Sequence, residues 1–131
     1  MIQAQPGPVS ARTEQVRRNV QALIAGIRGG LAEEVYRRFY SPQARCLEAW
    51  QREYPRAIPG VAGRAFLGDQ VQVHEAAAVR VLVDGDTSMI EWRVLASANK
   101  GPRKDEVIPI RQVWIQTWSG DRIIEEEYYA P

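Results

Sequence analysis

The apolar residues of the N-terminal part of the chain recur at helical spacing. They form one stripe of about three turns, made by Val16, Val20, Leu23, Ile24 and Ile27. Thr13 followed by Glu14 predicts the start of this helix, as an N-cap with an acid in the first turn. Gly29-Gly30 predicts its end. A second helix is expected from Leu31 to Ser41-Pro42, because the residue before a proline is pushed out of helical geometry.

From residue 70 onward the apolar pattern changes to a period of two, which is typical of half-buried strands. Three long strands are expected at 70–83, 87–98 and 106–118, followed by a final strand at 122–129. Asp84-Gly85-Asp86 is a strong hairpin turn between the first two. Residues 44–50 are interpreted as a short strand and 51–69 as loop. Helices followed by a meander of antiparallel strands predict an α+β fold, with the helices on one side of a curved sheet.

The alternation also predicts which side chains face the core. On the first long strand the valines share one face, and His74 falls on the other. On the second, Trp92 is expected inside, with Glu91 and Arg93 outside as an ordinary ion pair. One face of the third long strand alternates amides with indoles, which fits a polar pocket wall or an interface. That face consists of Gln112, Trp114, Gln116 and Trp118.

Length and composition narrow the function classes. The chain has 131 residues, so residues 13–131 are expected to form one domain after a flexible segment at 1–12. A formal charge of +1 gives no field to recruit nucleic acid or an anionic membrane, and no apolar run reaches the roughly 20 residues of a membrane span. The N-terminus has no apolar signal-peptide core, which together with the single cysteine, Cys46, favours the cytoplasm. One histidine and one cysteine argue against a metal site, and no cofactor is expected because no cofactor motif is present.

Four stretches, which together span most of residues 13–131, carry a family pattern. They are VRRNVQALIAGIRGGLAEEVYRRFYSPQARCLE (16–48), VHEAAAVRVLVDGD (73–86), SMIEWRV (88–94) and VWIQTWSGDRIIEEEYYA (113–130). Their order and turns resemble the nuclear transport factor 2-like superfamily and, within it, the SnoaL-like polyketide cyclase group. The resemblance implies a cone-shaped α+β barrel with a deep pocket, and homodimers packed sheet to sheet. The superfamily includes ketosteroid isomerases, polyketide and ester cyclases, limonene-epoxide-hydrolase-type enzymes and modules that only bind.

The resemblance also implies a candidate base. In the ketosteroid isomerases, the carboxylate of the general base occupies the place that Glu48 holds in ARCLEA at 44–49. A carboxylate in an apolar cone suits proton transfer near neutral pH, because burial disfavours its charged form. The tyrosine and the second acid of those isomerases correspond to about Asn19 and Val113, which argues against steroid isomerisation. A structural glutamate at the strand end is the alternative reading of Glu48.

His74 and Glu126 complete the candidate acid–base groups. His74 is expected to look toward a dimer partner or water unless a β-bulge inverts its strand, and a structural role is the alternative to catalysis. In the final strand, three consecutive glutamates at 125–127 cannot all share one face, so at most two of them line a pocket. Glu126 with Tyr128 is favoured as the pocket pair.

Aromatic residues favour a cavity for a flat organic ligand, although they also fill cores and dimer faces. The candidate ligand-binding residues are Tyr36, Tyr40, Trp50, Tyr54, Trp92, Trp114 and Tyr128. We therefore expect a cofactor-free cyclase, isomerase or hydrolase that acts on a small hydrophobic organic molecule by general acid–base catalysis. One alternative is a non-catalytic ligand-binding or dimerisation module of the same fold. The other is a limonene-epoxide-hydrolase-type enzyme, with Glu91 and Arg93 as the acid and base of one strand face.

Overall fold

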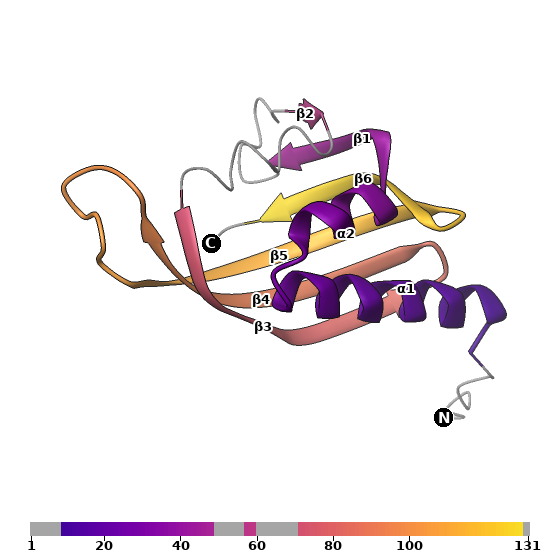
Figure 1. Ribbon diagram of the computed structural model, residues 1–131. Helices are drawn as coiled ribbons and strands as arrows, with labels where there is room; N and C mark the ends of the chain where they lie inside the picture. Colours follow the sequence, from indigo (N-terminus) through magenta and orange to yellow (C-terminus); the bar gives the residue numbers. More distant parts are fainter. Residues whose placement is uncertain (1–8, 49–56, 60–70, 130–131) are drawn as a thin grey trace, which may run out of the picture.

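The computed structural model describes residues 9–48, 57–59 and 71–129. Two helices come first (Figure 1): α1, Ala11–Arg28, and α2, Ala32–Phe39. The strands are β1, Tyr40–Glu48; β2, Ala57–Pro59; β3, Val71–Asp84; β4, Thr87–Ala98; β5, Ile108–Ser119; and β6, Arg122–Tyr129. Both predicted helices are therefore present, and β4 and β6 have the bounds that the alternation predicts. The short strand β2 lies in the segment that the sequence assigned to loop, so that assignment was wrong at residues 57–59.

The strands form one six-stranded sheet in the order β2-β1-β6-β5-β4-β3. Neighbouring strands are antiparallel, except that β1 and β6 are parallel. Both helices lie across the same side of this sheet (Figure 1), which we call the inner face; the opposite side is the outer face. The predicted α+β class, with helices on one side of a mainly antiparallel sheet, is thus confirmed. Neither helix has the length and apolar character that crossing a bilayer requires.

Helix α1 is fastened to two hairpin turns at the same end of the sheet. Its N-cap is Ser10 rather than the predicted Thr13, because the Ser10 hydroxyl accepts a hydrogen bond from the Thr13 backbone N–H at 3.0 Å. The Thr13 hydroxyl instead accepts from the Gly85 N–H of the β3–β4 turn at 2.9 Å. At the β5–β6 turn, Asp121 accepts from Gln15 at 2.8 Å and from Asn19 at 3.0 Å. These bonds set the position of α1 over the inner face.

A tight turn reverses the chain between α1 and α2. Gly30 adopts a φ of 80°, a left-handed conformation that favours glycine, and the Leu31 N–H donates back to the Gly26 carbonyl at 2.8 Å. The helices then pack so closely that a Cβ built on Gly26 would stand 2.2 Å from Val35 Cγ2. The absence of a side chain at Gly26 is therefore a packing requirement.

The core lies between the two helices and the inner face. Its buried members are Val16, Val20, Leu23, Ile24, Val35, Phe39, Tyr40, Ala44, Ile90, Trp92, Trp114, Trp118 and Ile123. The stripe predicted on α1 and the inner positions predicted on β4 and β5 are in this set or packed against it, except Ala96, which is buried outside the cluster, and the two glutamines of β5. Amphipathic periodicity therefore predicted the composition of the core well.

Two β-bulges change the faces of β3. The register with β4 shifts between Val73 and Glu75 and again between Ala78 and Arg80, so His74 and Val79 are the extra residues. Between these bulges Ala76 and Ala78 pack against the core, where the strict alternation had predicted the odd-numbered residues. Val79, expected on the core face, is 45% exposed. The prediction of one continuous valine face was therefore wrong over this part of the strand.

A third bulge lies in β6. Thr117 pairs with Glu125 and Trp118 pairs with Ile123, which leaves Ile124 as the extra residue. Ile123 therefore shares the inner face with Glu126, although the simple parity of the sequence had placed them on opposite faces. Both side chains have an exposed fraction of 0%, whereas Ile124 is 43% exposed.

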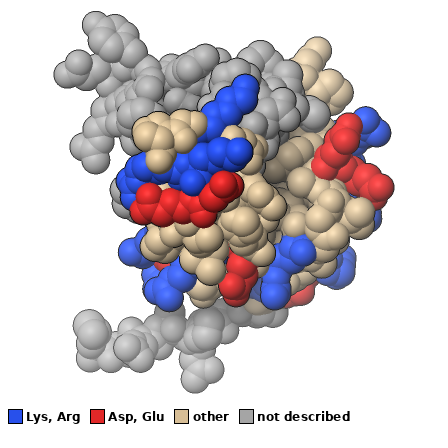
Figure 2. All heavy atoms as spheres, turned by 60° about the vertical axis from the view of Figure 1, so that its left-hand side comes forward, with Lys and Arg blue, Asp and Glu red and all other residues tan. Residues whose placement is uncertain are grey.

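The surface mixes charges of both signs. Figure 2 shows acidic and basic side chains in contact with one another on this face of the molecule, with uncharged surface between them. Exposed ion pairs on the surface include Arg37 with Glu33 at 2.6 Å and Arg103 with Glu106 at 2.7 Å. This pattern agrees with the small net charge and offers no strong field of one sign on this face.

Candidate functional site

The inner face carries a buried chain of polar side chains across three adjacent strands. Ser88 of β4 stands opposite Gln116 of β5, which in turn stands opposite Glu126 of β6. Tyr40, the first residue of β1, reaches the same carboxylate from the other side, and Trp118 reaches Ser88. Each of these five side chains is at most 2% exposed.

The hydrogen bonds of this network point in one direction, toward Glu126. Trp118 Nε1 donates to Ser88 Oγ at 2.8 Å, and Ser88 Oγ donates to Gln116 Oε1 at 2.7 Å. Gln116 Nε2 then donates to Glu126 Oε2 at 2.9 Å, and the Tyr40 hydroxyl donates to the same oxygen. Because the Gln116 carbonyl is held by Ser88, its amide group can only present N–H groups to Glu126. Aligned donors polarise one another, so the chain strengthens the bonds at the carboxylate.

Two opposing physical effects act on the charged form of the Glu126 carboxylate. Burial among apolar side chains disfavours a charged carboxylate, whereas the hydrogen bonds accepted by Oε2 favour it. Bonds to a charged group are worth roughly 1.5–3 kcal/mol each, more than bonds between neutral groups. A carboxylate placed in this balance is a candidate for proton transfer, since its environment can be shifted by a bound molecule.

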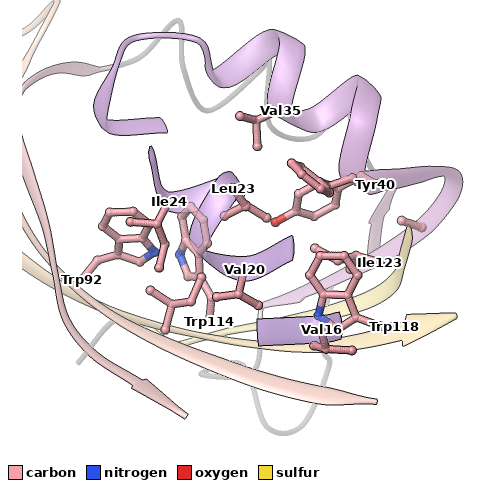
Figure 3. Packing of buried hydrophobic residues seen from close by; sticks show 13 residues of the cluster. Val16, Val20, Leu23, Ile24, Val35, Tyr40, Trp92, Trp114, Trp118 and Ile123 are labelled. Atoms are coloured by element: carbon pink, nitrogen blue, oxygen red, sulfur yellow. The ribbon is translucent and has the colours of Figure 1, made fainter. Parts of the chain in front are cut away.

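Aromatic rings also lie on the inner face, and Figure 3 shows four of them: Tyr40, Trp92, Trp114 and Trp118. The centroids of the Trp92 and Trp114 rings lie 5.3 Å apart at an interplanar angle of 53°, and Tyr36 meets Tyr40 edge to face at 5.3 Å. Tyr128 is half-buried, packs against the core and stands opposite Trp114 in the sheet register. Five of the seven aromatic candidates, Tyr36, Tyr40, Trp92, Trp114 and Tyr128, are thus brought to one face. Trp50 and Tyr54 lie outside the described residues.

The indole of Trp92 differs from the other described indoles. Trp118 Nε1 is bonded to Ser88, and Trp114 Nε1 donates to Gln112 Oε1 at 3.3 Å. Trp92 is 1% exposed, yet its Nε1 has no hydrogen-bond partner among the residues that the structure describes. An unsatisfied buried donor costs roughly 1–3 kcal/mol, so such a group in a native fold calls for an explanation.

The other polar candidates occupy the outer face. His74 Nε2 lies 2.8 Å from Ser97 Oγ, and strand alternation places Ser97 on the face of Glu91 and Arg93. Glu91 is 6% exposed and forms an ion pair with Arg111 at 3.1 Å. Strands β4 and β5 lie between His74 and Glu126, so the structure does not bring these two predicted catalytic residues together.

Glu48 is the last residue of β1, and its backbone is in register with Tyr128 of β6. Its side chain is not among those the structure describes. Within the described residues no group of three or more His, Cys, Asp or Glu side chains is placed to hold a metal ion. An open groove of about 400 Å³ lies along the β3–β4 edge, and neither Glu126 nor Tyr40 is among its lining residues.

Sequence reasoning missed Ser88 and the role of Tyr40 as a partner of the carboxylate. A signal for Ser88 was present, because it extends the apolar alternation of Ile90, Trp92 and Val94 by one polar position. A polar residue in a core stripe indicates a buried hydrogen bond. No comparable signal existed for Tyr40, which lies 86 residues from Glu126 in the chain.

Comparisons with known proteins agree on the fold. No protein-family model and no curated protein sequence matches this chain. Among solved structures, a SnoaL-like protein from Jannaschia sp. CCS1, proposed to be a polyketide cyclase, has a TM-score of 0.74 at 18% identity, covering 95% of this chain and 91% of that one. An LEH-like epoxide hydrolase of M. tuberculosis has a TM-score of 0.65 at 15% identity, covering 91% and 84%.

A third structural neighbour was solved with a small molecule bound. It is a protein of Catenulispora acidiphila DSM 44928 with a ketosteroid isomerase-like fold, in complex with trimethylamine. Its TM-score is 0.64 at 14% identity, covering 85% of this chain and 83% of that one. At such identities the likeness concerns the fold. The chain therefore has the nuclear transport factor 2-like fold, with SnoaL-like proteins among its structural neighbours across nearly its whole length.

Proposed function

We propose that this protein is a cofactor-independent enzyme that binds a small hydrophobic organic molecule at the inner face and acts on it by acid–base catalysis. The observation that carries the proposal is the environment of Glu126, a carboxylate with an exposed fraction of 0% that accepts hydrogen bonds from Tyr40 and Gln116 beside aromatic rings. The structural neighbours include proteins proposed to be cyclases and isomerases, which fits this class.

The chemistry assigned to Glu126 is a proton shuttle. Its carboxylate accepts a proton from an acidic C–H group of the substrate, and the electron pair of that bond moves into the neighbouring π-system. The protonated carboxyl then returns the proton to another atom, which completes an isomerisation or a ring closure without any redox change. Tyr40 and Gln116 hold the carboxylate in one orientation, because both donate to the same oxygen, Oε2.

Glu48 is the second base that we propose, on the resemblance to the isomerases. Its register opposite Tyr128 places its backbone at the end of β1, next to the strand that carries Glu126. Glu48→Gln is expected to abolish turnover while the fold is preserved. Retained turnover would remove Glu48 from the mechanism.

The test begins with thermal shifts against terpenoid, steroid and polyketide-type ligands, followed by mass-spectrometric analysis of each binder for conversion. A pocket binder is expected to raise Tm saturably. Glu126→Gln should lower turnover by about 10²-fold or more, the usual contribution of general acid–base catalysis. The matched control is Glu127→Gln, whose carboxylate is on the same strand but accepts from the exposed hydroxyl of Tyr129 at 2.9 Å. Unchanged turnover in Glu126→Gln would overturn the proposal.

A non-catalytic ligand-binding module is the second candidate. The observation that favours it is the near-complete burial of the network, with Glu126 at 0% and Tyr40 at 1% exposure, which is also what a structural polar cluster shows. In that case a ligand that raises Tm is recovered chemically unchanged after long incubation with the wild-type protein. An epoxide hydrolase of the LEH type would instead convert an epoxide such as limonene oxide to its diol.

We also propose a homodimer formed through the outer face. Arg93 and Arg111 stand directly opposite each other on β4 and β5, an arrangement that is unfavourable without nearby acids. Glu91 supplies one acid, and Glu125 and Glu127 lie on the outer face of β6. Glu127 pairs with Ile115, so the glutamates differ from Arg111 both in strand and in level along the sheet. A two-fold axis that lies between the two outer faces and runs oblique to the strands would bring the arginines of one copy over the β6 glutamates of the other, which complements the charges of both.

A further inference from the structure

We propose that the indole N–H of Trp92 is the group that recognises the ligand, by donating a hydrogen bond to a neutral oxygen such as a ketone, ester or ether oxygen. This inference rests on the proposed function, because it places the ligand on the same inner face. It adds the chemical class of the ligand: a compact apolar molecule with one uncharged acceptor oxygen.

The first argument is the contrast among the described indoles. Trp114 and Trp118 lie on β5 of the same face, and their Nε1 groups have side-chain acceptors, Gln112 Oε1 and Ser88 Oγ. Trp92, on the adjacent strand, is equally buried and has no acceptor among the described residues. The inner face thus satisfies two indoles with dedicated polar side chains and leaves the third as a donor directed into an apolar region.

The surroundings of Trp92 fit a small flat molecule. Figure 3 shows the Trp92 nitrogen on the side of the ring that faces Trp114 and Ile24 of α1. The Trp92 and Trp114 rings are tilted by 53° rather than stacked, with centroids 5.3 Å apart. On β3 the residue opposite Trp92 is Ala78, and both Ala78 and Ala76 pack against the core, so the side chains on that side of the indole are small. On β5 the residue opposite Trp92 is Gln112. Aromatic walls with one polar group are the usual composition of a site for a drug-sized organic molecule.

The acceptor is inferred to be uncharged. The charged residues next to Trp92 in the chain, Glu91 and Arg93, lie on the outer face. The inner residues around the indole are uncharged: Ala78 and Trp114 belong to or pack against the apolar core, and Gln112, opposite Trp92 on β5, is a neutral amide. A carboxylate or phosphate placed there would lose its hydration without gaining a countercharge. An indole N–H donates only, so it selects acceptors over hydrocarbons and over groups that only donate. Because the indole is shielded from water, a single hydrogen bond to it should give a large difference in affinity between ligands with and without an acceptor oxygen.

The experiment uses two ligand pairs that differ by one carbonyl group: 1-indanone with indane, and carvone with limonene. Indole N–H signals are observed in ¹H–¹⁵N spectra of the protein, and Trp92→Phe identifies the signal of Trp92 by its loss. The Trp92 signal is expected to move downfield on addition of the carbonyl member of at least one pair, and not with its hydrocarbon partner.

Affinities provide a second reading. Trp92→Phe retains an aromatic ring but removes the N–H together with part of the indole, and the hydrocarbon member measures the effect of the lost ring volume. The variant should therefore weaken binding of the carbonyl member by about tenfold more than binding of the hydrocarbon. Trp118→Phe is the control: it loses the bond to Ser88 and lowers Tm, but keeps the ratio of carbonyl to hydrocarbon affinity. If no carbonyl ligand moves the Trp92 signal, or if both members of each pair move it equally, the inference is overturned.

The two proposals fail separately. Glu126→Gln tests proton transfer and is expected to leave the response of the Trp92 signal intact, because Glu126 takes no part in the proposed hydrogen bond. A Trp92 response without any turnover would contradict the enzyme and support the recognition site. Turnover that depends on Glu126, without any ligand-induced shift of the Trp92 signal, would support the enzyme and contradict the recognition site.

Discussion

Gln116 and Glu126 stand directly opposite each other on β5 and β6, and the amide nitrogen of Gln116 donates to the Glu126 carboxylate at 2.9 Å. The carbonyl of the same amide accepts from Ser88 at 2.7 Å, which fixes its orientation. The position of the carboxylate is therefore set by sheet register, the most rigid element available in this fold, rather than by a loop. Such positioning on a strand is what an acid–base group requires.

The buried and the exposed tyrosine–glutamate pairs should differ in their contribution to stability. Tyr40→Phe removes a donor from a fully buried carboxylate and is expected to lower the free energy of unfolding by about 1–3 kcal/mol. Tyr129→Phe removes the corresponding bond to Glu127 at the outer face and should stay within about 0.5 kcal/mol of wild type. Urea denaturation measures both. Equal losses of unfolding free energy in the two variants would contradict the expected contribution of burial to the Tyr40–Glu126 hydrogen bond.

Contact between the helices makes Gly26 intolerant of a side chain. Gly26→Ala should raise helix propensity by about 1 kcal/mol, but its Cβ would stand 2.2 Å from Val35 Cγ2. Overpacking is expected to dominate, with a net loss of about 1–3 kcal/mol in urea denaturation. In the Val35→Ala background the same change should cost much less, because the clashing methyl groups are gone. Additive effects in this double-mutant cycle would contradict the close contact.

The Asp121 carboxylate should make stability depend on pH at the acidic end. Hydrogen bonds from Asn19 and then from Gln15 hold the pKa of Asp121 below its ordinary value. A pKa lowered by folding contributes stability that is present above the unfolded-state pKa of about 3.9 and is lost as the pH falls through the folded-state pKa.

Stability curves at pH 7 and at pH 2–4 for wild type and Asp121→Asn check this expectation. The advantage of wild type over the variant should be present at neutral pH and shrink as the pH falls below about 4. Asn19→Ala should reduce the pH dependence, since Asn19 is the larger cause of the shift. A difference that does not change with pH would remove Asp121 as a tether of α1.

The proposed dimer predicts a sharp effect of one charge at the centre of the outer face. Ile115 stands between Met89 of β4 and Glu127 of β6, so Ile115→Lys would place a charge in the interface and is expected to give monomers in light scattering. The control is Leu31→Lys at the N-cap of α2, where Leu31 is 49% exposed and away from the sheet. A wild-type protein that is monomeric at high micromolar concentration would refute the dimer.

The candidate site was only partly visible in the sequence. Parity groups Glu126 with Tyr128 on one face of the strand but does not decide which face lines a pocket. In the structure both side chains are on the side of the sheet that packs against the helices. The same rule failed for Ile123, because the bulge at Ile124 shifts the register by one residue. Bulges of this kind depend on pairing with a neighbouring strand and leave no mark in the alternation of a single strand.

By itself, the sequence determined the helices, the two hairpins, most of the core and the α+β class, because these follow from local periodicity and turn chemistry. The tertiary structure decided the parallel pairing of β1 with β6, which brings Tyr40 to Glu126 across 86 residues of chain. It also decided the bulges of β3 and β6, which set the faces of Ala78 and Ile123. These features depend on contacts between strands that are far apart in the sequence. A short stretch of sequence contains only one partner of each such contact, so its pattern cannot predict the pairing.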